Sequence, residues 1–561
     1  MKRTSCLSSA FALLSVCFFS CGENKVPDYP VLVKAMNLKT GAVISCGPAG
    51  NEFGEVNFVV SGSPEIAKEF NLAVKLLHSF EYDEAEKVFA GIIAKEPTLA
   101  MAYWGVAMAN FHPLWTPPTE TELKKGAQAL AFAMEREEKS PRERAYIEAL
   151  ATYYNSWETV DHRTRCLAFE KAMEALYKAF PDDKETAVFY ALSLVAAADP
   201  SDKTYAKQKK AGDLLNRLYP GQPDHPGIVH YIIHTYDYPE LATAALPAAR
   251  KYASVAPSSA HALHMPSHIF TRLGLWEEAI GSNLASVASA QCYAEQAGIR
   301  GHWDEELHGL DYLVYAYLQK GDNDAAKKQW DYLAAINEVQ PVNFKVAYAF
   351  AAIPSRYLVE NRLWKEAASL QVKPANFDWK AYPWQKAMIH FTRLLGAVHT
   401  GQLDAANGEL AAMVTLQQEL AAQKDAYKVN QVGIQIASGD AWIKWKEGKR
   451  TEALQRMQEA ADLEDKTGKH PVTPGEVVPA KELLGDLLLQ MAEPEKALAV
   501  YTANLQKHPK RFNGLYGAAV AAERSGRMEE ARALYRQLLS VAKSGASERP
   551  ELSKARNFVK G

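Results

Sequence analysis

The sequence predicts an all-α protein built from stacked helical hairpins, behind a small N-terminal cap that favours short β-strands. From about residue 66 onward, apolar side chains recur with helical rather than strand periodicity, and one short turn pattern recurs along the chain. A hydrophobic content of 48% excludes a disordered chain. The formal charge of −3 excludes a generally basic nucleic-acid-binding protein, because no excess of cations is present to neutralise phosphates.

The first predicted hairpin shows how each unit is built. Two amphipathic helices of about 14 residues each are joined by a turn, and Pro97 ends the second helix. The apolar positions of this hairpin are Leu72, Ala73, Leu76, Tyr82, Ala85, Phe89 and Ile92. The turn of the unit then recurs, with an alanine at its end, at residues 274–279, 321–326, 363–367, 401–406, 493–497 and 526–531. This hairpin pattern resembles the tetratricopeptide repeat (TPR), whose period is about 34 residues and whose stacked units form a superhelix with a concave face.

The chain as a whole also resembles a family of bacterial TPR-containing secreted or lipidated proteins. The segments that carry this resemblance are residues 100–108, 112–115, 225–227, 230–234, 261–268, 311–319, 470–475 and 482–486. The resemblance covers about residues 45–540. It implies the TPR fold and no assigned activity.

The predicted division of the chain follows from these patterns. Residues 1–20 form a signal peptide, and 21–65 form an extended cap with β-prone runs at 31–33, 42–44 and 56–60. The remaining parts are a histidine-rich TPR-like array at 66–340, a second array at 341–545 and a tail at 546–561.

The N-terminus has the layout of a bacterial export signal. Lys2 and Arg3 precede an apolar run at 11–19, and Cys21 follows Ser20 where a lipoprotein carries its acylated cysteine. We therefore expect an exported protein of the cell envelope, held by a lipid on Cys21 at a membrane facing the periplasm or the surface. Plain secretion is the alternative. No second long apolar run is present, so only the anchor should contact the membrane.

The three cysteines after Cys21, which are Cys46, Cys166 and Cys292, have no metal-type spacing and are predicted to be isolated buried thiols. Two prolines, Pro266 and Pro354, lie ten residues before a tryptophan of a predicted turn. Each falls inside a predicted first helix, where a kink is expected.

Histidines are concentrated in one part of the chain. Eight of the fifteen lie between His225 and His308. His261, His264 and His268 follow i, i+3, i+7 spacing, which places them on one helical face. Two further pairs, His230/His234 and His264/His268, have the i, i+4 spacing of known metal ligands. We therefore consider a divalent transition metal bound by His261, His264 and His268, with an anion or peptide-carboxylate site and ordinary structural histidines as alternatives.

The TPR resemblance implies that the first helix of each hairpin lines the concave face. The residues it places there are Tyr231, His234, His261, His264, His268, His308, Asp311, Arg356, Glu482 and Asp486. The leading hypothesis is a non-enzymatic exported scaffold that binds a peptide, protein partner or small ligand on this face. The alternative is a metal-dependent enzyme or metal carrier, with Glu482 or Asp311 as the base. The proline-rich loop at 112–118 is either a lid or a rigid connector.

Overall fold

The computed structural model describes residues 29–561 except 49, 51, 115–116, 138 and 543–548. The predicted signal peptide and Cys21 lie outside the described residues. The described chain is an all-α superhelix of stacked helical hairpins, as the sequence predicts. None of the described helices is both long enough and apolar enough to cross a bilayer.

The N-terminal half runs from the cap to the middle of the superhelix. Its helices are α1 (Tyr29–Met36), α2 (Pro64–His78), α3 (Tyr82–Lys95), α4 (Ala100–Ala109), α5 (Glu120–Glu135), α6 (Pro141–Tyr154), α7 (His162–Ala179), α8 (Lys184–Ala196), α9 (Ala206–Leu218), the 3-10 helix η1 (Tyr219–Gly221), α10 (Pro226–Tyr236), α11 (Ala242–Val255), α12 (Ala260–His264), α13 (Pro266–Leu273), α14 (Trp276–Gln296) and α15 (Asp304–Gln319).

The C-terminal half continues the same architecture. Its helices are α16 (Asn323–Ala335), α17 (Phe344–Glu360), α18 (Trp364–Ala368), the 3-10 helix η2 (Trp379–Ala381), α19 (Pro383–His399), α20 (Leu403–Ala422), α21 (Ala426–Lys446), α22 (Arg450–Thr467), α23 (Ala480–Gln490), α24 (Pro494–Lys507), α25 (Phe512–Arg524), α26 (Met528–Val541) and α27 (Pro550–Lys560). Two short strands, β1 (His302–Trp303) and β2 (Val339–Gln340), pair in parallel with His302 opposite Val339.

Close packing between hairpins depends on small residues in the helices. Gly485 on α23 and Gly517 on α25 both lie against the ring of Tyr501 on α24. A Cβ atom at Gly517 would lie 2.3 Å from the Cζ atom of Tyr501, closer than packed carbon atoms allow. Glycine at these positions therefore lets three successive helices stack around one buried tyrosine.

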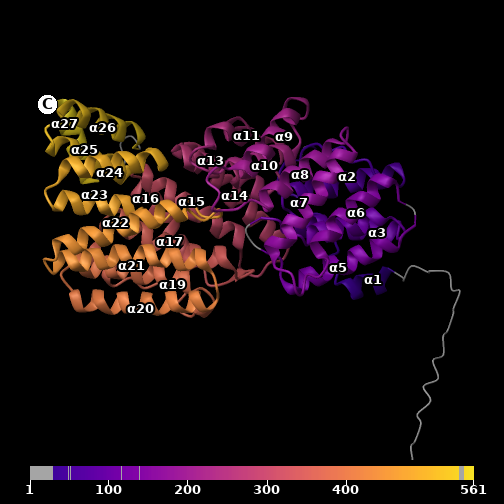
Figure 1. The fold of residues 1–561 in the computed structure, drawn as a ribbon, viewed down its shortest axis with the longest axis horizontal. Helices are drawn as coiled ribbons and strands as arrows, with labels where there is room; N and C mark the ends of the chain where they lie inside the picture. The colour runs from indigo at the N-terminus through magenta and orange to yellow at the C-terminus, as the bar shows by residue number, and fades with distance from the viewer. Residues whose placement is uncertain (1–28, 49, 51, 115–116, 138, 543–548) are drawn as a thin grey trace, which may run out of the picture.

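The superhelix turns back on itself, so that its C-terminal units meet its middle. Helix α25 packs against α15, and the Trp276 Nε1–H donates to the carbonyl of Lys510 over 3.0 Å. The amide of Phe512 donates to Gln319 Oε1, also over 3.0 Å. Figure 1 shows the result: N-terminal helices form one half of the molecule, C-terminal helices form the other, and α14 and α15 lie between them.

The N-terminal cap differs from the prediction, because its described residues form no strand. The first β-prone run lies in helix α1, where Leu32 and Met36 are buried one turn apart. The run at 56–60 stays extended without a strand partner. There the amide of Phe58 donates to Asn71 Oδ1 over 2.7 Å, and the Asn71 amide donates back to the Phe58 carbonyl. Tertiary packing against α2 and α3 thus overrides β propensity in this segment.

The prediction of three isolated thiols is wrong for two of the cysteines. Cys46 and Cys292 form a disulfide that joins the extended N-terminal segment to α14, whereas Cys166 is a free buried thiol. The fold brings together two positions 246 residues apart, which spacing along the chain does not reveal. The two prolines also behave differently. The helix breaks at Pro266, between α12 and α13, whereas α17 continues through Pro354.

Candidate metal centre

Six histidines from the histidine-rich segment gather into two groups of three. The first trio is His230, His234 and His261, and the second trio is His264, His268 and His308. Within each trio, one nitrogen from every ring lies within 4.8 Å of the others. The predicted set of His261, His264 and His268 is therefore divided between two neighbouring groups.

The local helix geometry explains how the trios form. His230 and His234 lie one turn apart on α10, and His264 and His268 lie one turn apart across the break at Pro266. His261 begins the face of α12 that continues to His264, so the two trios are adjacent. The ring centroids of His234 and His268 are 6.3 Å apart. His308 comes from α15, with its ring centroid 4.2 Å from that of His264.

In the first trio the ring nitrogens meet at hydrogen-bond distance. His230 Nε2 lies 2.9 Å from His234 Nε2 and 3.2 Å from His261 Nε2. On the other side of the ring, His230 Nδ1 lies 2.6 Å from the backbone carbonyl of His78. A carbonyl oxygen can only accept, so Nδ1 carries the hydrogen and the neutral ring presents a lone pair on Nε2.

The second trio repeats this arrangement with two locked rings. His264 Nδ1 donates to Asn283 Oδ1 over 2.7 Å, and the Asn283 amide is oriented because its Nδ2 donates to the Ala279 carbonyl. His268 Nδ1 donates to the carboxylate of Asp237 over 3.0 Å. Both neutral rings therefore present lone pairs on Nε2, and these two nitrogens lie 3.1 Å apart. Two facing lone pairs repel each other unless a cation lies between them.

A proton is a poor candidate for that cation. It would convert one ring into an imidazolium in a buried environment, and burial disfavours the charged form. Burial is the main cause that lowers the pKa of His268, and the Asp237 carboxylate only partly opposes it. The pKa values of His230, His234, His264 and His308 lie well below the ordinary value, because of burial and then of neighbouring histidines. The pKa of His261 is lowered to about 3, again mainly by burial.

The nitrogen spacing fits a transition-metal ion. Bonds of about 2.0–2.1 Å at angles between roughly 90° and 110° place two ligand nitrogens about 2.8–3.4 Å apart. The three Nε2–Nε2 distances within the trios, 2.9, 3.1 and 3.2 Å, fall inside this range. Neutral imidazole is also the form of histidine that binds metal, and partners on Nδ1 are typical of the groups that orient metal-ligating histidines.

Asp237 ties the second trio to a distant part of the chain. Its carboxylate accepts from His268 Nδ1, from Arg272 Nε over 2.8 Å and from Lys469 Nζ over 3.2 Å. The cations Lys469 and Arg272 together with His268 hold the pKa of Asp237 well below its usual range, despite burial that opposes ionisation. The ring of His268 is therefore fixed by the Asp237 carboxylate, which Arg272 and Lys469 hold in place.

A third buried group, His78, Glu185 and His225, is already satisfied by protein partners. Glu185 accepts from His225 Nε2 over 2.7 Å and from His78 Nε2 over 3.0 Å. The remaining nitrogens are also engaged, His78 Nδ1 with the Tyr231 hydroxyl and His225 Nδ1 with the amide of Ile228. This network holds the segment whose carbonyl, at His78, orients His230. It acts as a support for the first trio.

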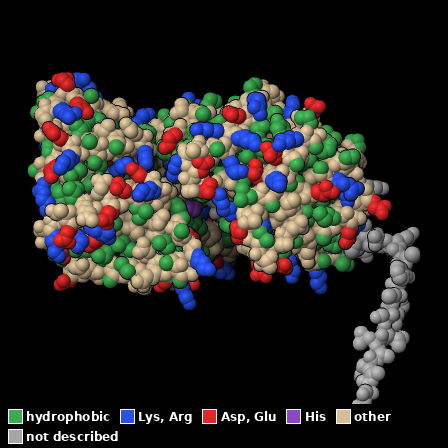
Figure 2. Space-filling view, viewed as in Figure 1, with side chains coloured by type: hydrophobic (Ala, Val, Ile, Leu, Met, Phe, Trp, Pro, Cys, Tyr) green, Lys and Arg blue, Asp and Glu red, His purple; other side chains and the backbone are tan. Residues whose placement is uncertain are grey.

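Both trios open onto one cavity of about 480 Å³. His261 of the first trio and His268 and His308 of the second line its wall. Its other walls are largely apolar and aromatic, and they include Phe80, Tyr82, Leu114, Trp303, Phe344 and Val472. The ring of Phe80 stacks on His234 and on His261, with centroid distances of 5.6 Å in both cases. Figure 2 shows a hollow between the two halves of the molecule, with histidine visible inside it.

Two loops complete this cavity. His112, Leu114 and Pro117 of the proline-rich loop line one side, so this loop is a wall of the cavity. Pro471 and Val472 line another side. They belong to the strap, which is the segment between α22 and α23 at residues 468–479.

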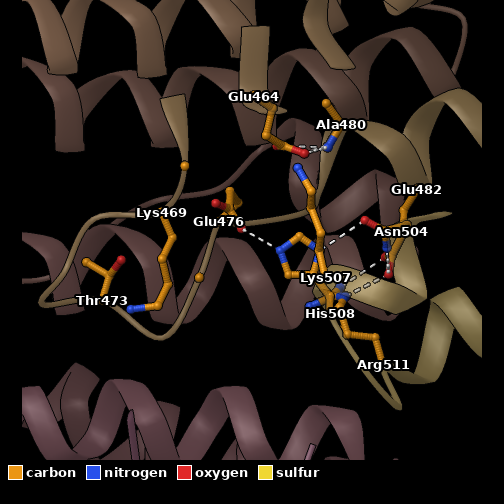
Figure 3. A network of polar contacts seen from close by, with 12 residues as sticks. Glu464, Lys469, Thr473, Glu476, Ala480, Glu482, Asn504, Lys507, His508 and Arg511 are labelled. Carbon is orange, nitrogen blue, oxygen red and sulfur yellow. Dashed lines mark hydrogen bonds and ion pairs between the residues drawn. The ribbon is translucent and has the colours of Figure 1, made fainter. Parts of the chain in front are cut away.

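The strap contacts Arg356, one of the residues that the sequence places on the concave face, and the nearby Tyr312 and Tyr348. The Tyr312 hydroxyl donates to the carbonyl of Val472 over 3.1 Å. Arg356 and Tyr348 donate to the carbonyl of Gly475 over 2.6 and 3.0 Å. Figure 3 shows the strap between Glu464 and Ala480, with Lys469 on one side and Glu476 close to His508. A segment of the protein itself thus covers Arg356 and the residues beside it.

The other residues predicted for the concave face are bound within the protein. Asp311 forms an ion pair with Arg356, and Glu482 accepts from Arg511 Nε over 2.7 Å. The remaining two predicted residues have similar roles. Asp486 accepts from Arg362 and from the Tyr501 hydroxyl, and the Tyr231 hydroxyl contacts His78 Nδ1. Asp311 and Glu482 are therefore structural partners of arginines, and neither lines the cavity beside the trios.

Several residues of the site are absent from the predicted set. His230 shares the i, i+4 spacing of His264 and His268, so this signal is present in the sequence. Asp237, Asn283 and the carbonyl of His78 are not signalled, because their role depends on contacts between separate hairpins.

Comparisons with known proteins add little beyond the fold. No protein-family model matches the chain, and no curated protein matches it. Among solved structures, a monomeric mutant of IFIT1 with m7Gppp-AAAA matches with 10% identity and a TM-score of 0.33, over 83% of this chain and 95% of that one. The TPR domain of P58(IPK) matches with 14% identity and a TM-score of 0.19, over 88% and 98%. Likeness at this level carries no argument about function.

Proposed function

We propose that this protein is a metalloprotein that binds transition-metal ions through the two histidine trios and carries out metal-dependent chemistry in the adjoining cavity. The observation that carries the proposal is the pair of Nε2 atoms of His264 and His268. They face each other at 3.1 Å while the Nδ1 atom of each ring donates elsewhere. A metal ion between them turns this repulsive contact into two coordinate bonds.

The cavity favours an enzyme over a metal carrier. A carrier has to exchange its ion with a partner, which favours ligands near the surface. Here His264 and His268 are buried, and the second trio opens onto a cavity that is large enough for an organic molecule. An ion in this position would polarise a bound molecule or activate a small oxygen ligand.

A peptide-binding scaffold is less well supported. The strap lies against Tyr312, Tyr348 and Arg356, so this part of the molecule already holds a segment of the chain itself. A protein or peptide partner stays a prediction, and no contact among the described residues favours a particular one.

The decisive experiment is metal analysis of the purified chain after loading with copper, zinc, iron or nickel and removal of loosely bound ions. We expect tight binding to the wild type and loss of at least one equivalent in the double variant His264→Ala/His268→Ala. His390→Ala is the matched control, because His390 contacts Glu409 in the C-terminal half, away from the trios. Absence of every one of these metals from the folded wild type would refute the proposal.

We also propose that the protein acts outside the cytosol, anchored by lipid at Cys21. The support is the export-type leader and the Cys46–Cys292 disulfide, since structural disulfides persist in oxidising compartments. Labelling with a fatty-acid analogue tests the anchor. We expect the label on the wild type and none on Cys21→Ser, and recovery of unlabelled wild type in the soluble fraction would contradict it.

A further inference from the structure

We infer that the two histidine trios together hold a pair of copper ions, and that the ligand of this pair is dioxygen bound from the cavity. The inference rests on the proposed function, and it adds the number of ions, their identity and their ligand.

Two ions follow from the number and placement of the ligands. Each trio supplies three imidazoles, which is the number of protein ligands typical of a metal site that leaves one position open. The second trio has its own orienting partners, Asn283 and Asp237, separate from the His78 carbonyl that orients the first. Each trio thus has three ligands and orienting partners of its own.

The two sites face the same space. His261 of the first trio and His268 of the second both line the cavity, and these two residues lie on consecutive short helices. The His234 and His268 rings are 6.3 Å apart between centroids. A small molecule that enters the cavity can therefore reach both sites at once.

Copper follows from the neutrality of the ligands. All six ligands are imidazoles, whereas dinuclear iron and manganese centres use bridging carboxylates. The carboxylate nearest the second trio, Asp237, is neutralised by Arg272 and Lys469, so the surroundings of this trio carry no negative excess. Two zinc ions would bring four positive charges to this buried place, and two Cu(I) ions would bring only two, which lowers the cost of burial.

The acidic residues that line the cavity are held by other partners. Glu305 lies in an ion pair with Lys345, and Glu122 accepts the amide and hydroxyl of Thr119. Glu81 accepts from the Ser259 hydroxyl over 2.6 Å, and burial raises the pKa of Glu81 to about 8. None of these carboxylates belongs to either trio. Among N/O ligand sets, copper also has the highest affinity of the divalent first-row metals, so the site would retain it after oxidation.

Dioxygen suits a pair of one-electron metals in an apolar space. In the binding step each Cu(I) gives one electron, the two electrons pass to one dioxygen molecule, and the products are two Cu(II) ions and bound peroxide. The oxygen–oxygen bond order falls from two to one, no bond to a proton forms, and no further reductant is required. The apolar walls around Phe80, Trp303 and Phe344 leave room for an organic molecule beside the pair.

The test uses the full mature chain, loaded with Cu(I) without oxygen and then titrated with dioxygen. We expect two copper ions per chain, uptake of one dioxygen per chain, and an oxidised protein without a paramagnetic copper signal, because bridged Cu(II) ions are spin-coupled. His234→Ala and His308→Ala each remove one ligand from one trio. We expect each to keep one copper ion, to lose stoichiometric dioxygen uptake, and to show one isolated Cu(II) signal after chemical oxidation.

The outcomes separate this inference from the proposed function. Two copper ions that give two independent paramagnetic signals, or that take up no dioxygen, would refute the pair while leaving a metalloprotein. Binding of zinc with no retention of copper would do the same. Failure to bind any metal would refute both. Circular dichroism and thermal unfolding of the variants show whether a loss of copper or of dioxygen uptake reflects misfolding. The titration of the wild type tests the inference without any variant.

Discussion

Replacing Asn283 with leucine tests whether the orientation of the imidazoles is the basis of metal binding. The Asn283 side chain is buried on α14, and its Oδ1 accepts from His264 Nδ1 over 2.7 Å. Leucine has the same branching at Cγ but no acceptor. The His264 ring then loses the partner that keeps its hydrogen on Nδ1, and the hydrogen can move to Nε2, where it blocks coordination.

The magnitude follows from the role of such orienting partners. Loss of one typically lowers metal affinity about 10–100-fold, which corresponds to about 1.4–2.7 kcal/mol of binding free energy. The metal-free variant should also lose about 1–3 kcal/mol of unfolding free energy, because His264 Nδ1 is left buried without a hydrogen-bond partner in either tautomer. The two effects are measured separately, by competition with a chelator of known affinity and by urea unfolding of the apoprotein.

Asn283→Asp is the matched control for this position. A carboxylate keeps an acceptor for His264 Nδ1 and gives up only the donation from Asn283 Nδ2 to the Ala279 carbonyl. Its metal affinity should equal or exceed that of the wild type. Equal affinity of the wild type, Asn283→Leu and Asn283→Asp in folded protein would refute the idea that tautomer locking prepares the site.

Three further predictions concern the stability of the chain. The imidazoles of the trios have folded-state pKa values below the unfolded value, about 3 for His261, so they favour folding above an unfolded pKa of about 6.5. The apoprotein should therefore lose stability as the pH falls below about 6.5, seen as a lower urea midpoint at pH 5 than at pH 7.5, and an unchanged midpoint would contradict the neutral-ring assignment. Changing both Cys46 and Cys292 to serine should lower the unfolding free energy by about 2–4 kcal/mol, and reductant should affect only the wild type. Arg511→Met leaves two buried glutamates without their shared cation, so it should cost about 3–5 kcal/mol in chemical unfolding, whereas a change under 1 kcal/mol would contradict a structural role.

The hairpin architecture could be predicted because its signals are local. The turn at 274–279 and the apolar spacing from Leu72 to Ile92 each report on contacts within one hairpin. In the structure the turn joins α13 to α14, and the apolar residues lie on α2 and α3. The secondary structure of the N-terminal cap could not be predicted in this way, because Val31 and Val33 favour strands in isolation. Only the packing of Leu32 and Met36 against the first hairpins makes this segment helical.

The site could be predicted only in part, for the same reason. The i, i+4 pair of His264 and His268 is visible in the sequence and reappears as two nitrogens 3.1 Å apart. The partner that completes this trio, His308, lies 44 residues after His264, and superhelical stacking alone brings them together. The strap shows the same limit, because its contact with Asp237 through Lys469 spans 232 residues.

The most direct test of the central claim is anomalous diffraction from crystals of the copper-loaded protein. We expect two anomalous peaks at the copper edge, one in each trio, with three imidazole nitrogens about 2.0–2.1 Å from each peak. Density for the metal elsewhere on the chain, with both trios empty at full loading, would contradict the account.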